Sequence, residues 1–294
     1  MSQPNQDPWT VLRLLEWTTD FFKKKGSDSP RLDAEVLLAH ARECERIQLY
    51  TAFNEEPSEE QKIAFREMVR RRGEGTPVAQ LVGAKEFYSM SFRVDENVLI
   101  PRPETEHLVI EALDLAKASK ITERPLQIAD IGTGSGVIAI TIAKQLPTAE
   151  LVAVDQSESA LAIAKWNADK HQVADRIEFM QSDLLSAVES PARFDIICSN
   201  PPYVTSAEYE ELSPSVKDFE PKLALVSGPK GTEIIERILA EANTRLVDGG
   251  RLLIELSPMI ADACQELAEE AGYGDIRFIK DLAGHKRILS VTKE

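Results

Sequence analysis

Apolar residues recur three or four positions apart along the first third of the chain, which is the spacing of amphipathic helices. The segments 9–26, 29–43 and 58–75 show this spacing and carry helix-start or helix-stop residues at their ends, so they predict a small helical bundle. From residue 77 to residue 102 the pattern changes to short β-prone segments separated by turn residues. This change predicts a β-hairpin that joins the bundle to a second domain.

Beyond residue 102, short apolar runs alternate with helical patterns. The runs lie at 126–131, 151–154, 194–198 and 252–256, and the helical patterns lie at 104–118, 137–146, 158–170 and 232–246. Such β-α-β repetition predicts an α/β fold with a doubly wound, mostly parallel sheet covered by helices on both faces. The tail, 275–294, predicts a closing antiparallel hairpin. We therefore expect a helical domain at 1–76, a hairpin linker at 77–102 and an α/β domain at 103–294.

Composition narrows the class of protein. Hydrophobic residues make up 43% and charged residues 28%, as in globular proteins. No apolar run approaches the roughly 18–20 residues that span a bilayer, and the first ten residues lack the pattern of a signal peptide. We therefore expect a cytoplasmic protein that does not bind membranes, with a monomer as the default.

The polar residues exclude two kinds of site. The net charge of −15 opposes loose binding to nucleic acid, because such binding depends on neutralising phosphates. The three cysteines and four histidines are scattered singly along the chain. We therefore expect buried free thiols and no metal site.

The stretch ADIGTGSGVIAI places three alternating glycines between a predicted strand and a predicted helix. Gly132, Gly134 and Gly136 allow close approach of a ligand and positive φ, and the helix N-terminus behind them favours a negative group. A nicotinamide-binding loop needs Gly or Ala where this chain has Val137, and Asp130 would repel a pyrophosphate. The carboxylate of Asp130 suits an ammonium group instead. Because S-adenosylmethionine (AdoMet) offers both an amine and a carboxylate, the loop suits AdoMet better than a dinucleotide.

Two acidic residues follow at the ends of later predicted strands. Asp155 lies nineteen residues past Gly136, where a carboxylate can accept from both ribose hydroxyls. Asp183 ends a third predicted strand and would lie near the adenine. A strand-end aspartate alone more often caps a helix. The glycine loop and both acids in this order indicate an adenosine-containing cofactor.

Asn200, Pro201, Pro202 and Tyr203 follow directly after the apolar run that ends at residue 198. Prolines cannot donate to a β-ladder, so the two prolines must leave the sheet. A planar NH₂ group is a poor nucleophile, and the Asn200 side-chain oxygen and the Pro201 carbonyl could accept its two N–H groups and aim its lone pair at a methyl sulfonium. Tyr203 could stack on the planar group. The motif predicts amino-group methylation and fits adenine, cytosine or a glutamine amide equally.

With these motifs the sequence resembles the release factor glutamine methyltransferase family. The matching stretches are 77–106, 130–140, 152–155, 181–183, 199–204 and 282–289. The first, which contains IPRPETE, discriminates best, because generic AdoMet enzymes lack it. The resemblance implies a seven-stranded class I methyltransferase sheet, AdoMet as cofactor and a substrate-docking helical domain. It also implies methylation of the glutamine N5 in the Gly-Gly-Gln motif of class 1 peptide chain release factors.

The resemblance also assigns residues. It implies AdoMet contacts at Gly132, Thr133, Gly134, Ser135, Gly136, Asp155, Asp183 and Leu184, and glutamine binding by Asn200, Pro201, Pro202 and Tyr203, with Asn200, Pro201 and Tyr203 catalytic. Arg102 and Glu104 either shape the site or only support the start of the helix at 104–118. Two other hypotheses stay open: an amino-group methyltransferase of DNA or RNA, and a non-catalytic AdoMet-binding scaffold.

Overall fold

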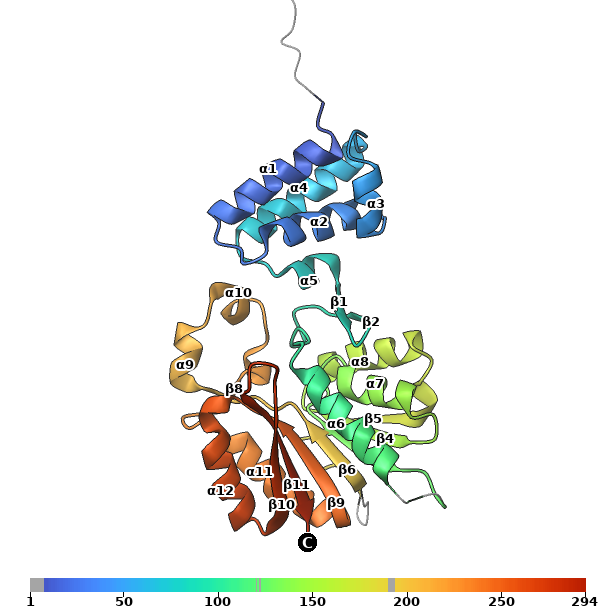
Figure 1. Cartoon of the computed structure of the whole chain (residues 1–294), viewed down its shortest axis with the longest axis vertical. Coiled ribbons are helices and arrows are strands. Elements are labelled where there is room, and N and C mark those ends of the chain that lie inside the picture. The colour runs from blue at the N-terminus through green and yellow to red at the C-terminus, as the bar shows by residue number, and fades with distance from the viewer. Residues whose placement is uncertain (1–7, 120, 122, 190–193) are drawn as a thin grey trace, which may run out of the picture. The chain divides into compact units, whose positions relative to one another are not determined.

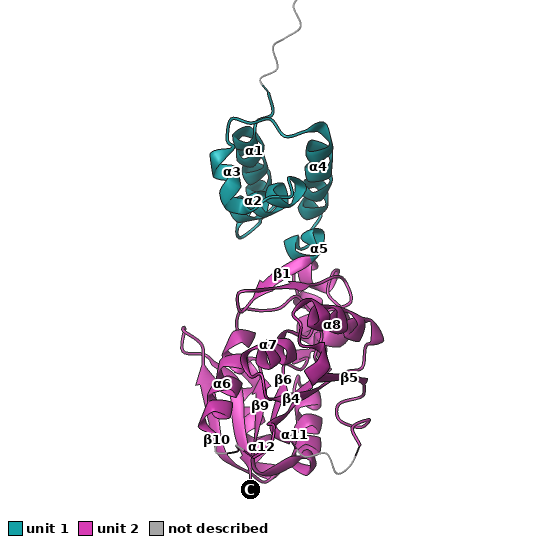
Figure 2. Cartoon of the chain, turned by 90° about the vertical axis from the view of Figure 1, so that its right-hand side faces the viewer, with its two compact units in different colours: residues 1–83 teal, residues 84–294 magenta. Residues whose placement is uncertain are grey.

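The computed structural model describes residues 8–119, 121, 123–189 and 194–294. They form two compact units, one ending at Gly83 and the other beginning at Ala84 (Figure 2). The division falls inside the segment that the sequence assigns to a linker. Residues 1–7, on which much of the signal-peptide expectation rests, lie outside the described residues. In the described part of the chain, no helix combines the length and the apolar character needed to cross a membrane.

The first unit, residues 8–83 of the described chain, consists of helices. They are α1 (Val11–Lys24), α2 (Pro30–Ala41), α3 (Arg46–Thr51), α4 (Glu59–Gly73) and α5 (Val78–Val82). Ser58 caps α4, because its side chain accepts from the Gln61 backbone N–H. The Gln61 side chain in turn accepts from the Ser58 backbone N–H, which completes a capping box. Fully buried Leu15, Leu37 and Phe22 form the centre of this unit's own core. The predicted helices are confirmed at α1, α2 and α4, whereas α3 was not predicted.

Helix α5 corrects the expectation that the whole segment from residue 77 is β-prone. Pro77 stands at the N-cap, and Gly83 ends the helix with a left-handed φ of 68°. These two residues define a single short turn of helix, so the local start and stop signals outweigh the β-propensity of the valines between them.

The predicted hairpin forms immediately after α5. Strands β1 (Ala84–Phe87) and β2 (Met90–Arg93) pair antiparallel, and the two turn residues, Tyr88 and Ser89, both have positive φ, as a type I′ turn requires. Phe87 and Phe92 are buried in the core of the second unit, with their rings edge to face. The hairpin therefore belongs to the second unit.

Within the described residues, the main sheet has seven strands in the order β10-β11-β9-β6-β3-β4-β5 (Figure 1). The strands are β3 (Gln127–Ile131), β4 (Glu150–Asp155), β5 (Ile177–Gln181), β6 (Phe194–Ser199), β9 (Leu246–Glu255), β10 (Tyr273–Lys280) and β11 (Lys286–Lys293). The five strands from β9 to β5 pair in parallel, and β11 lies antiparallel between β9 and β10. The predicted doubly wound fold and closing hairpin are confirmed.

Helices cover both faces of this sheet. They are α6 (Thr105–Ala118), α7 (Val137–Gln145), α8 (Glu158–Lys170), α11 (Glu233–Arg245) and α12 (Ala261–Glu270). The first three lie over one face and the last two over the other, each set with its own apolar core (Figure 1). This arrangement follows from the buried, apolar strands, which need cover on both sides.

A segment between β6 and α11 was not predicted. It contains β7 (Val204–Thr205), α9 (Ser206–Glu211), α10 (Pro214–Lys217), a 3₁₀ turn at Lys222–Ala224 and β8 (Val226–Gly228). Two further 3₁₀ turns lie elsewhere in the chain, at Ala174–Arg176 and Pro258–Ile260. Strands β7 and β8 form a separate two-stranded parallel ladder. The elements are too short to leave a periodic signal in the sequence, yet their chain reaches the site described below.

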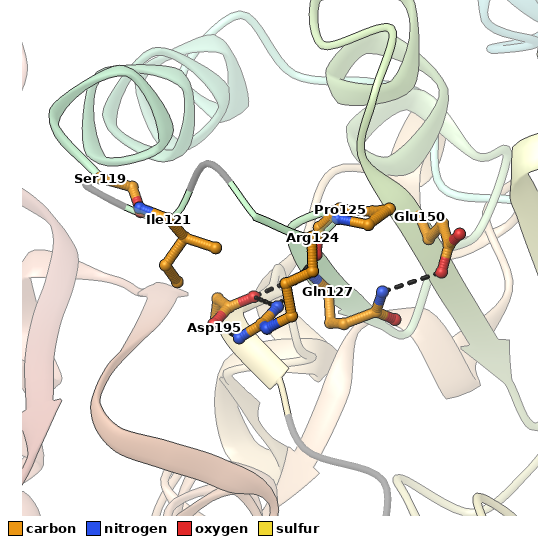
Figure 3. A network of polar contacts seen from close by, with 7 residues as sticks. All are labelled: Ser119, Ile121, Arg124, Pro125, Gln127, Glu150 and Asp195. Carbon is orange, nitrogen blue, oxygen red and sulfur yellow. Dashed lines mark hydrogen bonds and ion pairs between the residues drawn. The ribbon is translucent and has the colours of Figure 1, made fainter.

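An ionic network joins the amino ends of three neighbouring strands (Figure 3). The Arg124 guanidinium donates to both carboxylate oxygens of Asp195 at 2.6 and 2.7 Å, and the Gln127 backbone N–H donates to Asp195 Oδ2 at 2.9 Å. The Gln127 side chain in turn donates to Glu150 on β4 at 2.8 Å. The network fixes the register of β3, β4 and β6 at the end of the sheet opposite the site.

Candidate active site

The site lies where the strand order reverses at the centre of the sheet. From β3 the chain continues through β4 and β5 to one side, while β6 and β9 lie on the other. Loops that leave adjacent strands in opposite directions open a crevice at the carboxyl ends of those strands. A pocket occupies this position, lined by residues of the loops after β3, β4, β5 and β6 and by residues of the segments 97–105 and 221–226.

The glycine loop after β3 forms one wall of the pocket. Gly132 and Gly134 have φ of 73° and 55°, and a Cβ on either would project into open space with no contact closer than 4.0 Å. The loop is held from behind, because Thr133 Oγ1 donates to Asp130 Oδ2 at 2.7 Å and the Gly132 and Thr133 N–H groups donate to the Val154 carbonyl. Backbone free of side chains therefore faces the pocket, as a closely approaching ligand needs.

Gly136 serves another purpose. A Cβ there would lie 2.6 Å from Ile140 Cδ1 and 3.2 Å from Ala164 Cβ, and the residue does not line the pocket. Its φ of 85° places it at the N-cap of α7. The third glycine of the motif is therefore required by the packing of α7 against α8.

Asp155 ends β4 and lines the pocket beside the glycine loop. Its Oδ2 accepts from the Gly134 N–H and its Oδ1 from the Ser157 N–H, both at 2.9 Å. Burial raises the pKa of this carboxyl, and backbone hydrogen bonds from Ser157, Gly134 and Gln156 oppose that rise. The bare backbone of Gly132 and Gly134 and the adjacent carboxylate fit the methionine tail and ribose of AdoMet.

The two neighbouring residues Asp183 and Leu184 differ in placement. Asp183 does not line the pocket, and its half-exposed carboxylate pairs with Arg237 at 2.8 Å, which lowers its pKa. Leu184 is buried, lines the pocket and has a φ of 50°, a strained backbone conformation for a side chain of this size. The pocket therefore receives Leu184 and not Asp183.

Asn200, Pro201 and Pro202 line the pocket directly after β6. The Asn200 Nδ2 donates to Thr105 Oγ1 at 3.1 Å. Among the described residues, neither the Asn200 Oδ1 nor the Pro201 carbonyl accepts a hydrogen bond from the protein. Two acceptors on adjacent residues are therefore available at the pocket.

Tyr203 does not line the pocket, although it follows the two prolines. Burial, and next the negative charge of Glu255, raises the pKa of Tyr203 to about 12, while Arg102 and Arg287 act in the opposite direction. The phenol therefore stays protonated in the physiological pH range.

Arg102 and Glu104 occupy different positions. Arg102 lines the pocket and its Nη2 lies 2.6 Å from Glu220 Oε1, while Glu220 Oε2 accepts from the Ile100 N–H at 3.0 Å. Glu104 stands at the N-cap of α6, does not line the pocket and makes no side-chain cap bond. The buried Glu220 thus ties the 97–105 wall to the segment that continues into the 221–226 wall.

Three polar residues of this region were missed from the sequence: Thr105, Glu220 and Glu255. Glu255 left a signal, since an acid interrupts the otherwise apolar run LLIEL. Thr105 stands within IPRPETE but does not differ from an ordinary first-turn residue. Glu220 left no signal in the sequence, because its partner Arg102 is 118 residues away.

The mostly parallel sheet, its inserted antiparallel last strand and the glycine loop at the strand reversal define a class I AdoMet-dependent methyltransferase. Among solved structures, the N-terminal domain of human METTL16 in complex with SAH has the same fold, with a TM-score of 0.53 at 15% identity over 78% of this chain and 84% of that chain.

Sequence comparison gives the family. Residues 13–83 match the model of the PrmC N-terminal domain, and residues 108–213 match that of the methyltransferase small domain. The release factor glutamine methyltransferase of Rhodopirellula baltica is 62% identical over 291 residues, and that of Chlorobaculum tepidum 41% over 294, each match covering 98% of both chains. This chain belongs to the release factor glutamine methyltransferase family. The predicted family, enzyme class and AdoMet cofactor are confirmed, and with them methylation of a release factor glutamine.

Proposed function

We propose that this chain transfers the methyl group of AdoMet to the side-chain amide nitrogen, N5, of the glutamine in the Gly-Gly-Gln motif of class 1 release factors. One observation carries the proposal: in a chain of this family, Asn200 and Pro201 present two unused acceptors beside the glycine loop. A primary amide has two N–H groups, so two acceptors bind both and define the direction of the nitrogen lone pair.

The residues of the Asn-Pro-Pro-Tyr motif would act as follows. Bound AdoMet supplies an electrophilic methyl group on a cationic sulfur. Asn200 Oδ1 and the Pro201 carbonyl hold the glutamine NH₂ and favour the positive charge that develops on its nitrogen. Pro202 keeps the backbone of the motif fixed without adding a donor. Tyr203 supports the motif from behind the pocket wall.

We assign the cofactor to the wall formed by the glycine loop, with Gly132, Thr133, Gly134 and Ser135 along the methionine tail. Asp155 would accept from the ribose hydroxyls, and Leu184 would contact the adenine. Asp183 would act indirectly, since it orders Gln156, a pocket residue, through a side-chain hydrogen bond. Arg102 would shape the opposite wall.

The release factor would bind as a protein substrate, without nucleic acid, to a monomeric enzyme. We keep residues 1–76 as the proposed docking domain. Positions 1–80 carry 12 basic against 14 acidic residues, whereas positions 81–294 carry 22 against 35. The nearly neutral helical domain should therefore repel an acidic partner less than the strongly acidic remainder of the chain does. Because release factors act on ribosomes, we place the reaction in the cytoplasm.

The test is mass spectrometry of a release factor co-expressed with the wild type, with Asn200→Ala or with Asn243→Ala. The Asn243 side chain donates to the Ala271 carbonyl and does not line the pocket, so that variant is the matched control. We expect one added methyl on the Gly-Gly-Gln peptide with the wild type and the control. Asn200→Ala should lower kcat roughly 10²–10³-fold, the effect of removing one preorganised polar group, with the AdoMet Kd unchanged.

Two results would contradict the proposal. If the wild type binds AdoMet but leaves the release factor unmodified, the substrate is wrong, and transfer to duplex DNA or ribosomal RNA would then support the nucleic-acid hypothesis. If Asn200→Ala methylates at the wild-type rate, the role of the motif is wrong.

A further inference from the structure

A buried carboxylate lies directly behind the Asn-Pro-Pro-Tyr motif. Glu255 is the last residue of β9, is 2% exposed and does not line the pocket. Because Ser199 of β6 pairs with Ile254 of β9, Asn200 and Glu255 leave neighbouring strands side by side. One carboxylate oxygen, Oε2, has no hydrogen-bond partner among the described residues. An incompletely paired buried acid is unfavourable for folding, so its presence here needs an explanation.

The contacts of Glu255 lead to Asn200. The Thr105 and Asn200 side chains lie beside its carboxylate and oppose the rise of its pKa, and the Asn200 Nδ2 donates to Thr105 Oγ1 at 3.1 Å. An ionised carboxylate can only accept, so the Thr105 hydroxyl beside it directs its single proton toward Glu255. The Thr105 oxygen is then left as an acceptor and requires the NH₂ end of Asn200. Two partners thus select the same orientation of the amide.

We propose that Glu255 and Thr105 are positioning residues that hold the Asn200 amide with Nδ2 turned inward and Oδ1 turned toward the pocket, where Oδ1 accepts from the substrate NH₂ group. Without them the amide can rotate by 180°, which places a donor opposite the substrate's own N–H groups. The inference rests on the proposed function of Asn200 and extends it to the residues that fix its orientation.

The surrounding charges are consistent with an acceptor role. Burial raises the pKa of Glu255 to about 7, with Glu104 acting in the same direction, and Thr105, Arg287 and Asn200 oppose the rise. Glu104 stands at the N-cap of α6, Arg287 lies on β11 and Tyr203 follows β6, so charged or titratable groups face Glu255 from each of these neighbours. At pH 8 the carboxylate is ionised, which is the form that can only accept.

The experiment uses the full-length enzyme and a purified release factor at pH 8. We expect Thr105→Val and Glu255→Ala each to lower kcat roughly 10–100-fold, as loss of a partner behind an active-site residue does, with the AdoMet Kd unchanged. Thr105→Ser keeps the hydroxyl and should retain wild-type turnover. In an Asn200→Ala background, neither change should lower kcat further, because both act through Asn200.

A second measurement does not depend on turnover. The Asn200 side-chain amide protons, assigned in NMR spectra by their absence from Asn200→Ala, should exchange with solvent at least tenfold faster in Thr105→Val than in the wild type. Equal turnover and equal exchange in the wild type and Thr105→Val would overturn the inference. A further loss of kcat in the Asn200→Ala background would also overturn it, since the residues would then act independently of Asn200. If the wild type does not methylate the release factor, the proposed function fails, and amide exchange still decides the positioning role.

Discussion

Two buried acids at opposite ends of the central strands differ in how they are satisfied. Asp195 is the second residue of β6 and is 6% exposed, and Glu255 ends the neighbouring β9 and is 2% exposed. Asp195 receives two hydrogen bonds from Arg124 and one from the Gln127 backbone (Figure 3). Glu255 keeps one oxygen without a partner in the described chain. The same chemical group is thus fully paired at one end of the sheet and incompletely paired at the other.

This contrast separates the end of the sheet that contributes stability from the end where the chemistry takes place. Asp130, on β3, repeats the pattern of Glu255: its Oδ1 has no partner in the described residues, and burial raises its pKa to about 7. Both incompletely paired acids lie on the side of the sheet where the pocket opens. Burying an incompletely paired carboxylate costs stability. We infer that Asp130 and Glu255 are retained because Asp130 holds the glycine loop and Glu255 positions Asn200.

The largest effect should come from Asp195→Ala. The change leaves Arg124 and the Gln127 N–H without their acceptor, and we expect a loss of about 3–4 kcal/mol, the lower part of the range for a broken buried pair because Arg124 is 44% exposed. Hydrogen exchange of peptides from β3 and β6 measures it. The control Gln127→Ala removes only an exposed side-chain contact and should change stability by no more than about 0.5 kcal/mol. Turnover per folded molecule should stay at the wild-type value in both variants; reduced turnover would contradict the division between the two ends.

Glu255→Gln should act in the opposite direction on stability, and the effect should depend on pH. The carboxyl has a pKa of about 7 when folded against an ordinary value of 4.5, so the folded state binds more protons and stability falls as pH rises through this interval. In Glu255→Gln the side chain does not titrate, so the variant does not lose stability over this pH interval. We expect nearly equal stability at pH 4 and a variant more stable by about 2–3 kcal/mol at pH 8, measured by the same exchange method. A constant difference between the two proteins across this range would show that Glu255 does not titrate there.

The smallest effect concerns the ion pair of the pocket wall. Glu220→Gln keeps an acceptor for the Ile100 N–H but loses the charge that binds Arg102, so the 97–105 wall becomes less ordered. We expect roughly tenfold weaker AdoMet binding, about 1.4 kcal/mol, by calorimetry. Exchange of the β6 peptides should not change. Unaltered affinity would limit the pair to a structural role.

The parts predictable from sequence are those written in consecutive residues. The alternating glycines, the strand-end Asp155 and the Asn-Pro-Pro-Tyr motif each lie at the end of an apolar run, and parallel strands bring such ends to one edge. Gly136 and Asp183 show the limit of this reasoning. The glycine spacing does not reveal that Gly136 is needed for contact with Ala164, nor does the strand end reveal that Asp183 pairs with Arg237.

The order of the principal helices and strands, the glycine loop, the acceptor motif and the family are all written in the local sequence. Which residues lie behind that motif depends on how the strands are ordered in the folded sheet. Thr105 belongs to α6 and Glu255 to β9, and Thr105 lies 95 residues away in sequence from its partner Asn200, which follows β6. Local periodicity reports whether a residue is buried, whereas the hydrogen-bond partner of a buried polar group depends on strand order and register, which only the folded sheet establishes.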